Sequence, residues 1–289
     1  MRYVEPVFRP PSEADSYILQ ITYGCSHNAC TFCAMYREKP YRTRPFKEVQ
    51  EDIKLAAASY PSLSRVFLAD GDAMGQTAFS LTRILDCLNE HFPNLERVGI
   101  YSDAAGINRK TSDELRQLFE RKLAIVYIGL ESGSEEVLKR IQKHCTAQEM
   151  TAAVHKAKAA GMQTSVIALL GVGGRELTKT HADETAAVLS QMNPDYFSAL
   201  TLTIIEGTPL AAERAAGAFI PLTPEESLIE LRRIIECSRP HQSVTFRTNH
   251  ASNYVPLRGE LPADRQKLMN MIDHALANGR LKPEWLRGL

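Results

Sequence analysis

The sequence predicts an α/β protein built around a parallel β-sheet. Short runs of apolar, β-branched residues alternate with longer segments in which apolar residues recur at helical spacing. The runs are continuously apolar, which is typical of strands covered by helices on both faces. A doubly wound sheet and a barrel both satisfy this pattern, and 289 residues is within the range of one large α/β domain.

Six strands are predicted, and each is followed by a helix or a site-like loop. The first, SYILQIT, ends two residues before Gly24 and leads into a cysteine-rich loop. The others are similar apolar runs bounded by turn residues or by the start of a helix. The six predicted strands are residues 16–22, 65–70, 97–102, 125–131, 163–171 and 196–204.

The predicted helices carry start and stop signals. The first begins at Pro45, a residue favoured in the first turn, and ends before Pro61. In the third, Thr111 and Glu114 have the spacing of a capping box. The predicted helices between the strands are residues 45–60, 77–91, 111–122, 134–141, 147–160 and 177–191.

The pattern changes near Pro224. A helix over 224–238, a short apolar stretch at 243–246 and a terminal helix near 262–278 surround a polar loop that contains His250 and Tyr254. This loop either folds over an open site or is an ordinary connector. We therefore expect two parts, a core over residues 1–223 and a small α-rich C-terminal extension over residues 224–289.

The charge balance and the hydropathy pattern argue against broad nucleic-acid binding, a membrane span and a secretory signal. The chain holds 34 Lys plus Arg and 34 Asp plus Glu, a balance that argues against broad binding of nucleic acid. No run of 18 uncharged apolar residues occurs, and the first residues lack the apolar stretch of a secretory signal. We expect a cytoplasmic protein with no membrane partner.

The stretch GCSHNACTFCAMY predicts a metal site. It places Cys25, Cys30 and Cys33 close together, and six unevenly spaced cysteines do not suit a disulfide framework. Structural zinc normally takes four ligands, whereas an iron–sulfur cubane held by three cysteines keeps one iron open to a small molecule. A structural or redox-sensing site that holds zinc or an iron–sulfur cluster remains an alternative.

Candidate site loops follow four of the strands. They begin at Gly24, at Asp70-Gly71-Asp72, at Glu131-Ser132 and at Leu170-Gly171. The carboxyl ends of parallel strands meet at one edge of a sheet or barrel, and this edge carries the active site in such folds. We expect these four loops to line one site.

The cysteine loop resembles that of the radical S-adenosylmethionine (SAM) superfamily, with the pattern C-x3-C-x-aromatic-C. The first gap here is one residue longer, and Phe32 takes the aromatic position. The resemblance covers about residues 16–210 and is greatest to the branch with the Elongator catalytic subunit, methylthiotransferases and oxygen-independent coproporphyrinogen oxidase. It implies a partial (β/α)6 TIM-like barrel that binds a [4Fe–4S] cluster and SAM.

The resemblance also implies roles for individual residues. Cys25, Cys30 and Cys33 would ligate the cluster, and Phe32 would lie near the adenine. Asp70-Gly71-Asp72 takes the place of a Gly-Gly-Glu motif that meets the methionine amino group. Glu131 and Ser132 match the ribose-binding stretch, Lys143 would pair with the methionine carboxylate, and Leu170-Gly171 match the adenine-contacting stretch. The alternative for the Glu131-Ser132 stretch is that it precedes a helix cap near Ser134. The alternative for Lys143 is a solvated side chain, and Arg140 or Lys139 would then pair with the methionine carboxylate.

The activity implied is reductive cleavage of SAM to a 5′-deoxyadenosyl radical, which abstracts hydrogen from a substrate. An electron donor such as flavodoxin or ferredoxin is implied as well. The balanced charge and the lack of a recognisable RNA-binding appendage favour a small-molecule substrate by elimination. Radical modification of a tRNA or a peptide is the alternative that keeps the same chemistry.

Overall fold

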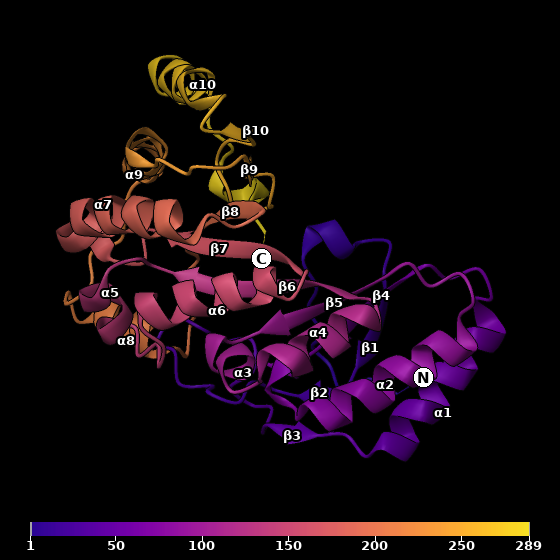
Figure 1. The fold of residues 1–289 in the computed structure, drawn as a ribbon. Helices are drawn as coiled ribbons and strands as arrows, with labels where there is room; N and C mark the ends of the chain where they lie inside the picture. Colours follow the sequence, from indigo (N-terminus) through magenta and orange to yellow (C-terminus); the bar gives the residue numbers. More distant parts are fainter. Residues whose placement is uncertain (1, 289) are drawn as a thin grey trace. The chain divides into compact units, whose positions relative to one another are not determined.

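The computed structural model describes residues 2–288, which divide into two compact units (Figure 1). Unit 1 contains residues 2–28, 35–128 and 152–164, and unit 2 contains residues 29–34, 129–151 and 165–288. Both are α/β, and eight of the described strands take part in mostly parallel pairing. Within residues 2–288, no helix combines the length and the apolar character needed to cross a membrane.

The sheet of unit 1 contains only parallel pairs. Its strands are β1 (Tyr17–Gln20), β4 (Arg65–Ala69), β5 (Arg97–Ser102) and β6 (Leu123–Glu131), in the order β1-β4-β5-β6. The interior of β4, residues 66–69, is fully buried, because helices and loops cover both faces of a parallel strand. A short antiparallel pair, β2 (Thr22–Tyr23) with β3 (Arg42–Thr43), flanks the cysteine loop.

The helices of unit 1 pack beside one another along the chain. The helix α2 contacts both α1 and α4, and the three lie together in Figure 1. The predicted capping box of α4 is confirmed, since Thr111 and Glu114 each hydrogen-bond the other's backbone N–H. The helices are α1 (Phe46–Ser59), α2 (Ala78–His91), α3 (Ala104–Asn108), α4 (Ser112–Glu120) and most of α6 (Ala147–Ala159), with 3-10 turns η1 (Pro11–Glu13) and η2 (Ala73–Gly75).

Unit 2 continues the parallel pattern and ends in an antiparallel hairpin. Strands β7 (Gln163–Leu170), β8 (Tyr196–Thr201) and β9 (Val244–Arg247) are parallel, and β10 (Arg258–Leu261) pairs antiparallel to β9. The helix α9 packs on α7, and α10 packs on α9. The helices are α5 (Glu135–Arg140), α7 (Gly174–Met192), α8 (Pro209–Ala215), α9 (Pro224–Cys237) and α10 (Arg265–Asn278), with the 3-10 turn η3 (Glu284–Leu286).

The predicted α/β class and the strand–helix alternation are confirmed, and the differences have local causes. The predicted strand 196–204 ends at Thr201. The amide of this residue donates to Ser252 Oγ instead of to a neighbouring strand, and its hydroxyl donates to Asn253 Oδ1. The sequence did not predict the short helices α3 and α8, which have too few residues to show a period. The boundary at residues 223 and 224 stays a prediction, and α9 shares unit 2 with α7.

Candidate active site

In unit 1, the buried carboxylate of Asp70 organises the start of the cysteine loop. Its Oδ2 accepts hydrogen bonds from Lys39 Nζ at 2.9 Å, from Gln20 Nε2 at 2.8 Å and from the Gly24 amide at 3.1 Å. Burial raises the pKa of Asp70, and the bonds from Lys39 and Gln20 oppose that rise. Lys39 is a buried partner with 6% of its side chain exposed.

Gly24 itself has no room for a side chain. Its φ is +70°, and a Cβ at this position would lie 2.2 Å from the Lys39 carbonyl oxygen. The chain therefore makes a close turn that only glycine can adopt without strain. This turn leads directly into Cys25.

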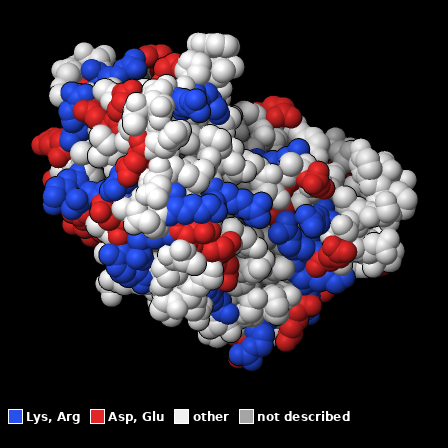
Figure 2. All heavy atoms as spheres, turned by 90° about the horizontal axis from the view of Figure 1, so that it is seen from above, with Lys and Arg blue, Asp and Glu red and all other residues white. Residues whose placement is uncertain are grey.

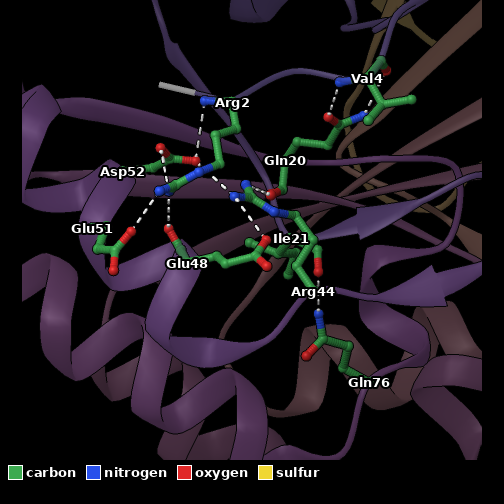
Figure 3. A network of polar contacts seen from close by, with 9 residues as sticks. All are labelled: Arg2, Val4, Gln20, Ile21, Arg44, Glu48, Glu51, Asp52 and Gln76. Atoms are coloured by element: carbon green, nitrogen blue, oxygen red, sulfur yellow. Dashed lines mark hydrogen bonds and ion pairs between the residues drawn. The ribbon is translucent and has the colours of Figure 1, made fainter.

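A second buried ion pair supports Gln20 from the side of α1. Arg44 donates to the Gln20 carbonyl at 2.7 Å and to Asp52 Oδ2 at 2.8 Å, and Figure 3 shows these groups converging beneath the N-terminal segment. The side-chain amide of Gln20 also binds the backbone of Val4: its oxygen accepts from the Val4 N–H, and its nitrogen donates to the Val4 carbonyl. Because Gln20 is fixed at both ends, its contact with Asp70 is preorganised.

Gly71 and Asp72 bring the end of β4 against the first cysteine. A Cβ on Gly71 would lie 2.6 Å from the Tyr36 ring and 3.0 Å from Cys25 Cβ. Asp72 is buried, and its two oxygens accept from Ser26 Oγ at 2.5 Å and from the Asp103 amide at 3.2 Å. Asp70 Oδ2 and both oxygens of Asp72 are thus already occupied, whereas Asp70 Oδ1 is buried without a hydrogen-bond partner among the described residues.

In unit 2, Cys30 and Cys33 lie on one tight turn. The Cys33 amide donates to the Cys30 carbonyl at 3.2 Å. Thr31 anchors the turn on both sides, since its amide donates to the Ile141 carbonyl at 2.9 Å and its carbonyl accepts from the Leu210 amide at 3.1 Å. Phe32 stands on the same turn and is half-buried.

Glu131 and Lys143 form a half-buried ion pair in unit 2. The distance from Lys143 Nζ to Glu131 Oε1 is 3.3 Å. Glu131 has φ +60°, which is rare for a residue with a side chain. A Cβ on Gly129 would lie 2.2 Å from Glu131 Oε1, so the glycine leaves the space that this carboxylate occupies. The sequence predicted both charged residues for the SAM site, and the structure brings them together.

The Ser132 side chain points into the interior of unit 2. It is fully buried, and its Oγ lies 2.8 Å from His181 Nδ1 while accepting a hydrogen bond from the Ser134 amide at 3.0 Å. Thr185 on the same helix as His181 accepts from the Gly133 amide at 2.9 Å. The role of Ser132 toward ribose stays a prediction, and the contacts of its hydroxyl are with His181 and the backbone.

The turn after β7 is held by a second buried carboxylate. Gly171 has φ +79°, and its amide donates to Glu230 Oε1 at 2.6 Å. Leu170 is buried, and its carbonyl accepts from the Leu202 amide at 2.9 Å. Burial raises the pKa of Glu230 to about 7, although bonds from Thr178 and Gly171 oppose the rise. Leu170 and Gly171 were predicted, whereas Glu230 was not.

The signal that could have identified His181 and Glu230 is their place on apolar helix faces. Glu230 follows Ser227 by three residues and precedes Ile234 by four, and all three are buried. His181 lies on the buried stripe of α7 with Ala182 and Thr185. A carboxylate or an imidazole on such a stripe requires a buried partner, but the sequence does not say which.

The donor set suits the metal site that the sequence predicted. The three loop cysteines form no disulfide and are of intermediate exposure, and Cys25 lies next to Gly24 and close to Gly71. Thiolates are the ligands of iron–sulfur clusters. A sequence model of the radical SAM superfamily matches residues 19–189. This range includes the three cysteines, and it includes Asp72 and Glu131, the carboxylates at the ends of two strands. The chain belongs to this superfamily.

Radical SAM enzymes use a [4Fe–4S] cluster and SAM. Curated relatives include a tRNA-2-methylthio-N(6)-dimethylallyladenosine synthase from Geobacillus kaustophilus, 26% identical over 67% of this chain and 37% of that protein. Coproporphyrinogen III oxidase from Escherichia coli matches with TM-score 0.56 and 18% identity, over 76% of this chain and 51% of that one. An Elp3 from Methanocaldococcus infernus matches with TM-score 0.56 and 14% identity, over 93% and 64%.

These comparisons confirm the predicted family, branch, fold class and cofactors. The chain therefore belongs to a superfamily of enzymes, whose members need a reductant and a substrate. The expectation that nucleic acid is not a partner finds no support, since a tRNA-modifying relative exists. This chain spans less than half of that relative's length.

Proposed function

We propose that this radical SAM enzyme ligates its cluster through Cys25, Cys30 and Cys33 and abstracts hydrogen from a small-molecule substrate. The observation that carries the ligand assignment is the matched superfamily model together with three loop cysteines that form no disulfide, the first of which follows the glycine turn at Gly24. When bound, the reduced cluster supplies the electron that cleaves SAM to a 5′-deoxyadenosyl radical.

Each unit contains residues that we assign to SAM. In unit 1, the Gly71 backbone offers a position for the methionine amino group, because Asp70 Oδ2 binds Lys39 and Asp72 Oδ2 binds Ser26 of the cysteine loop. In unit 2, Glu131 and Lys143 offer a carboxylate for ribose hydroxyls and an ammonium for the methionine carboxylate. The Phe32 backbone and the turn at Leu170-Gly171 would contact the adenine.

Charge supports a small-molecule substrate. The chain has equal numbers of acidic and basic residues, and on the face seen in Figure 2 the two kinds of side chain are interspersed. A polyanion held by phosphate contacts needs a concentration of Lys and Arg. The tRNA substrate of the Geobacillus relative is the observation that favours the second candidate, radical modification of tRNA.

The ligand assignment is tested by anaerobic reconstitution. We expect close to four irons and four sulfides per chain in the wild type, a strong loss of both in Cys30→Ala, and no loss in Cys237→Ala, a half-buried thiol in α9. Equal iron in Cys30→Ala and wild type would overturn the assignment, and bound zinc would favour the structural or sensing alternative.

The substrate class is tested with the same protein. Binding of bulk tRNA to the reconstituted enzyme at 50 and 200 mM salt separates the candidates, because phosphate contacts give a steep salt dependence. We expect weak binding at both salt concentrations. Tight, salt-sensitive binding would move the assignment to tRNA.

A further inference from the structure

A buried polar chain crosses the interior of unit 2 and joins two of the segments assigned above to SAM. It runs from Ser132 Oγ to His181 Nδ1 at 2.8 Å, and His181 Nε2 lies 3.6 Å from Glu230 Oε1. The same Glu230 oxygen accepts from the Gly171 amide at 2.6 Å. Each of the three side chains is at least 98% buried.

We infer one assignment of the hydrogen atoms in this chain from its contacts. Ser132 Oγ accepts from the Ser134 amide, which leaves its O–H free to donate to His181 Nδ1. His181 then carries its proton on Nε2, the nitrogen nearest to Glu230. Burial lowers the pKa of His181 to about 4, so the imidazole is neutral at physiological pH. Its Nε2 has no hydrogen-bond partner within residues 2–288.

Glu230 Oε1 therefore accepts one hydrogen bond, from the Gly171 amide, and the His181 Nε2 atom lies 3.6 Å from the same oxygen, beyond hydrogen-bond distance. Thr178 Oγ1 lies 2.5 Å from Oε2 and completes the carboxyl group's contacts. When Glu230 is ionised, the bond from the Gly171 amide becomes charge-assisted and the His181 N–H dipole is attracted to the negative charge, so both contacts are stronger than those with a neutral carboxyl group. When it is protonated, both contacts weaken.

Other charged groups around Glu230 are paired among themselves. The helix α7 contributes Arg175, Lys179 and Asp183, and Lys179 pairs with Asp183. On the face of α9 toward α10, Arg232 binds Asp273. The remaining pairs are Arg175 with Glu226 and Arg233 with Asp183. A cavity of about 160 Å³ lined by Arg175, Leu222, Ile229 and Glu230 gives the carboxyl group a route for proton exchange.

We propose that His181 and Glu230 are positioning residues, which lock the Ser132 turn to the Gly171 turn and thereby set the affinity of the enzyme for SAM. This inference rests on the proposed placement of SAM at Glu131 and at Leu170-Gly171. Because Glu230 belongs to α9, the C-terminal segment takes part in building the cofactor site. An ionised Glu230 holds the Gly171 turn more firmly than a protonated one, so affinity rises with pH near neutrality.

The test is equilibrium binding of SAM to the reconstituted, unreduced enzyme at pH 6 and pH 8, a condition without turnover. Glu230→Gln preserves an acceptor for Gly171 and a group for Thr178 but cannot ionise. We expect it to match the wild type at pH 6 and to bind SAM about tenfold more weakly at pH 8, the loss of one charge-assisted bond. Glu226→Gln, which changes a half-buried carboxylate one turn earlier that binds Arg175, is the matched control and follows the wild type at both pH values.

A second variant separates positioning from folding. His181→Asn can still reach Ser132 but not Glu230, and we expect it to lose most of the pH dependence while its unfolding midpoint at pH 8 stays within a few degrees of the wild type. Equal affinities of wild type, Glu230→Gln and His181→Asn at both pH values would overturn the inference alone. Failure of the wild type to bind SAM at all would instead overturn the proposed function.

Discussion

Asp70 in unit 1 and Glu230 in unit 2 each hold a glycine turn, but their charged surroundings differ. Each is a buried carboxylate that accepts the amide of a glycine at positive φ, Gly24 in one case and Gly171 in the other. Asp70 is balanced by the ammonium of Lys39 at 2.9 Å. Glu230 faces the neutral His181 and has no cation within hydrogen-bond distance among the described residues.

The difference predicts which of the two responds to pH. Burial raises the pKa of both carboxyl groups, but the ammonium of Lys39 opposes the rise at Asp70, whereas Glu230 has no such counter-charge and its pKa reaches about 7. The turn that leads into the cysteine loop is thus held by a carboxylate with a counter-charge. The turn assigned to adenine is held by a group that changes its protonation state near neutral pH.

Removal of the cation should have the largest effect on stability. Lys39→Met leaves Asp70 buried without its counter-charge, and we expect a loss of about 3 to 5 kcal/mol in the free energy of unfolding, measured with urea. Adding Asp70→Asn to this variant should restore much of the loss. Lys179→Met, which breaks an exposed pair with Asp183, should cost less than about 1 kcal/mol. A similar small cost for Lys39→Met would remove the distinction between the two carboxylates.

The pH dependence of stability should follow next in size. Glu230 has a folded pKa of about 7, above its unfolded value of 4.5, so its contribution is full at low pH and is lost as pH rises through 7. The stability of the wild type relative to Glu230→Gln should therefore fall by about 2 kcal/mol between pH 5.5 and pH 8. Urea unfolding of both proteins at the two pH values measures this difference.

His181 should show the opposite slope. Its folded pKa of about 4 lies below the unfolded value of 6.5, so its contribution is present above 6.5 and is lost as pH falls toward 4. The stability of the wild type relative to His181→Asn should rise by about 1 kcal/mol from pH 5.5 to pH 8. Slopes of the same sign for the two variants would contradict the neutral pairing of His181 with Glu230.

The half-buried pair of Glu131 and Lys143 should affect binding more than stability. Lys143→Met should weaken SAM binding about tenfold, because a charged donor to the methionine carboxylate is lost. Lys139→Met, an exposed lysine in α5, serves as the matched control and should leave the affinity unchanged. The reverse result would transfer the carboxylate-binding role to Lys139.

The sequence predicted most of the fold because periodicity and strand-end motifs are local signals. It predicted the cysteine loop, the strand ends at Asp70, Glu131 and Gly171, and the capping box of α4. It did not predict that Lys39 turns inward to Asp70, because a basic residue in a polar loop has no local mark of burial. Nor did it pair His181 with Glu230, since 49 residues separate them and only the packing of α9 on α7 brings them together.

The most direct test of the central claim is formation of 5′-deoxyadenosine by the anaerobically reconstituted and reduced enzyme. We predict that the wild type and Cys237→Ala form it from SAM, and that Cys30→Ala forms no more than a reaction without enzyme. Equal product in Cys30→Ala, or none in a wild type that holds its cluster and binds SAM, would contradict the account.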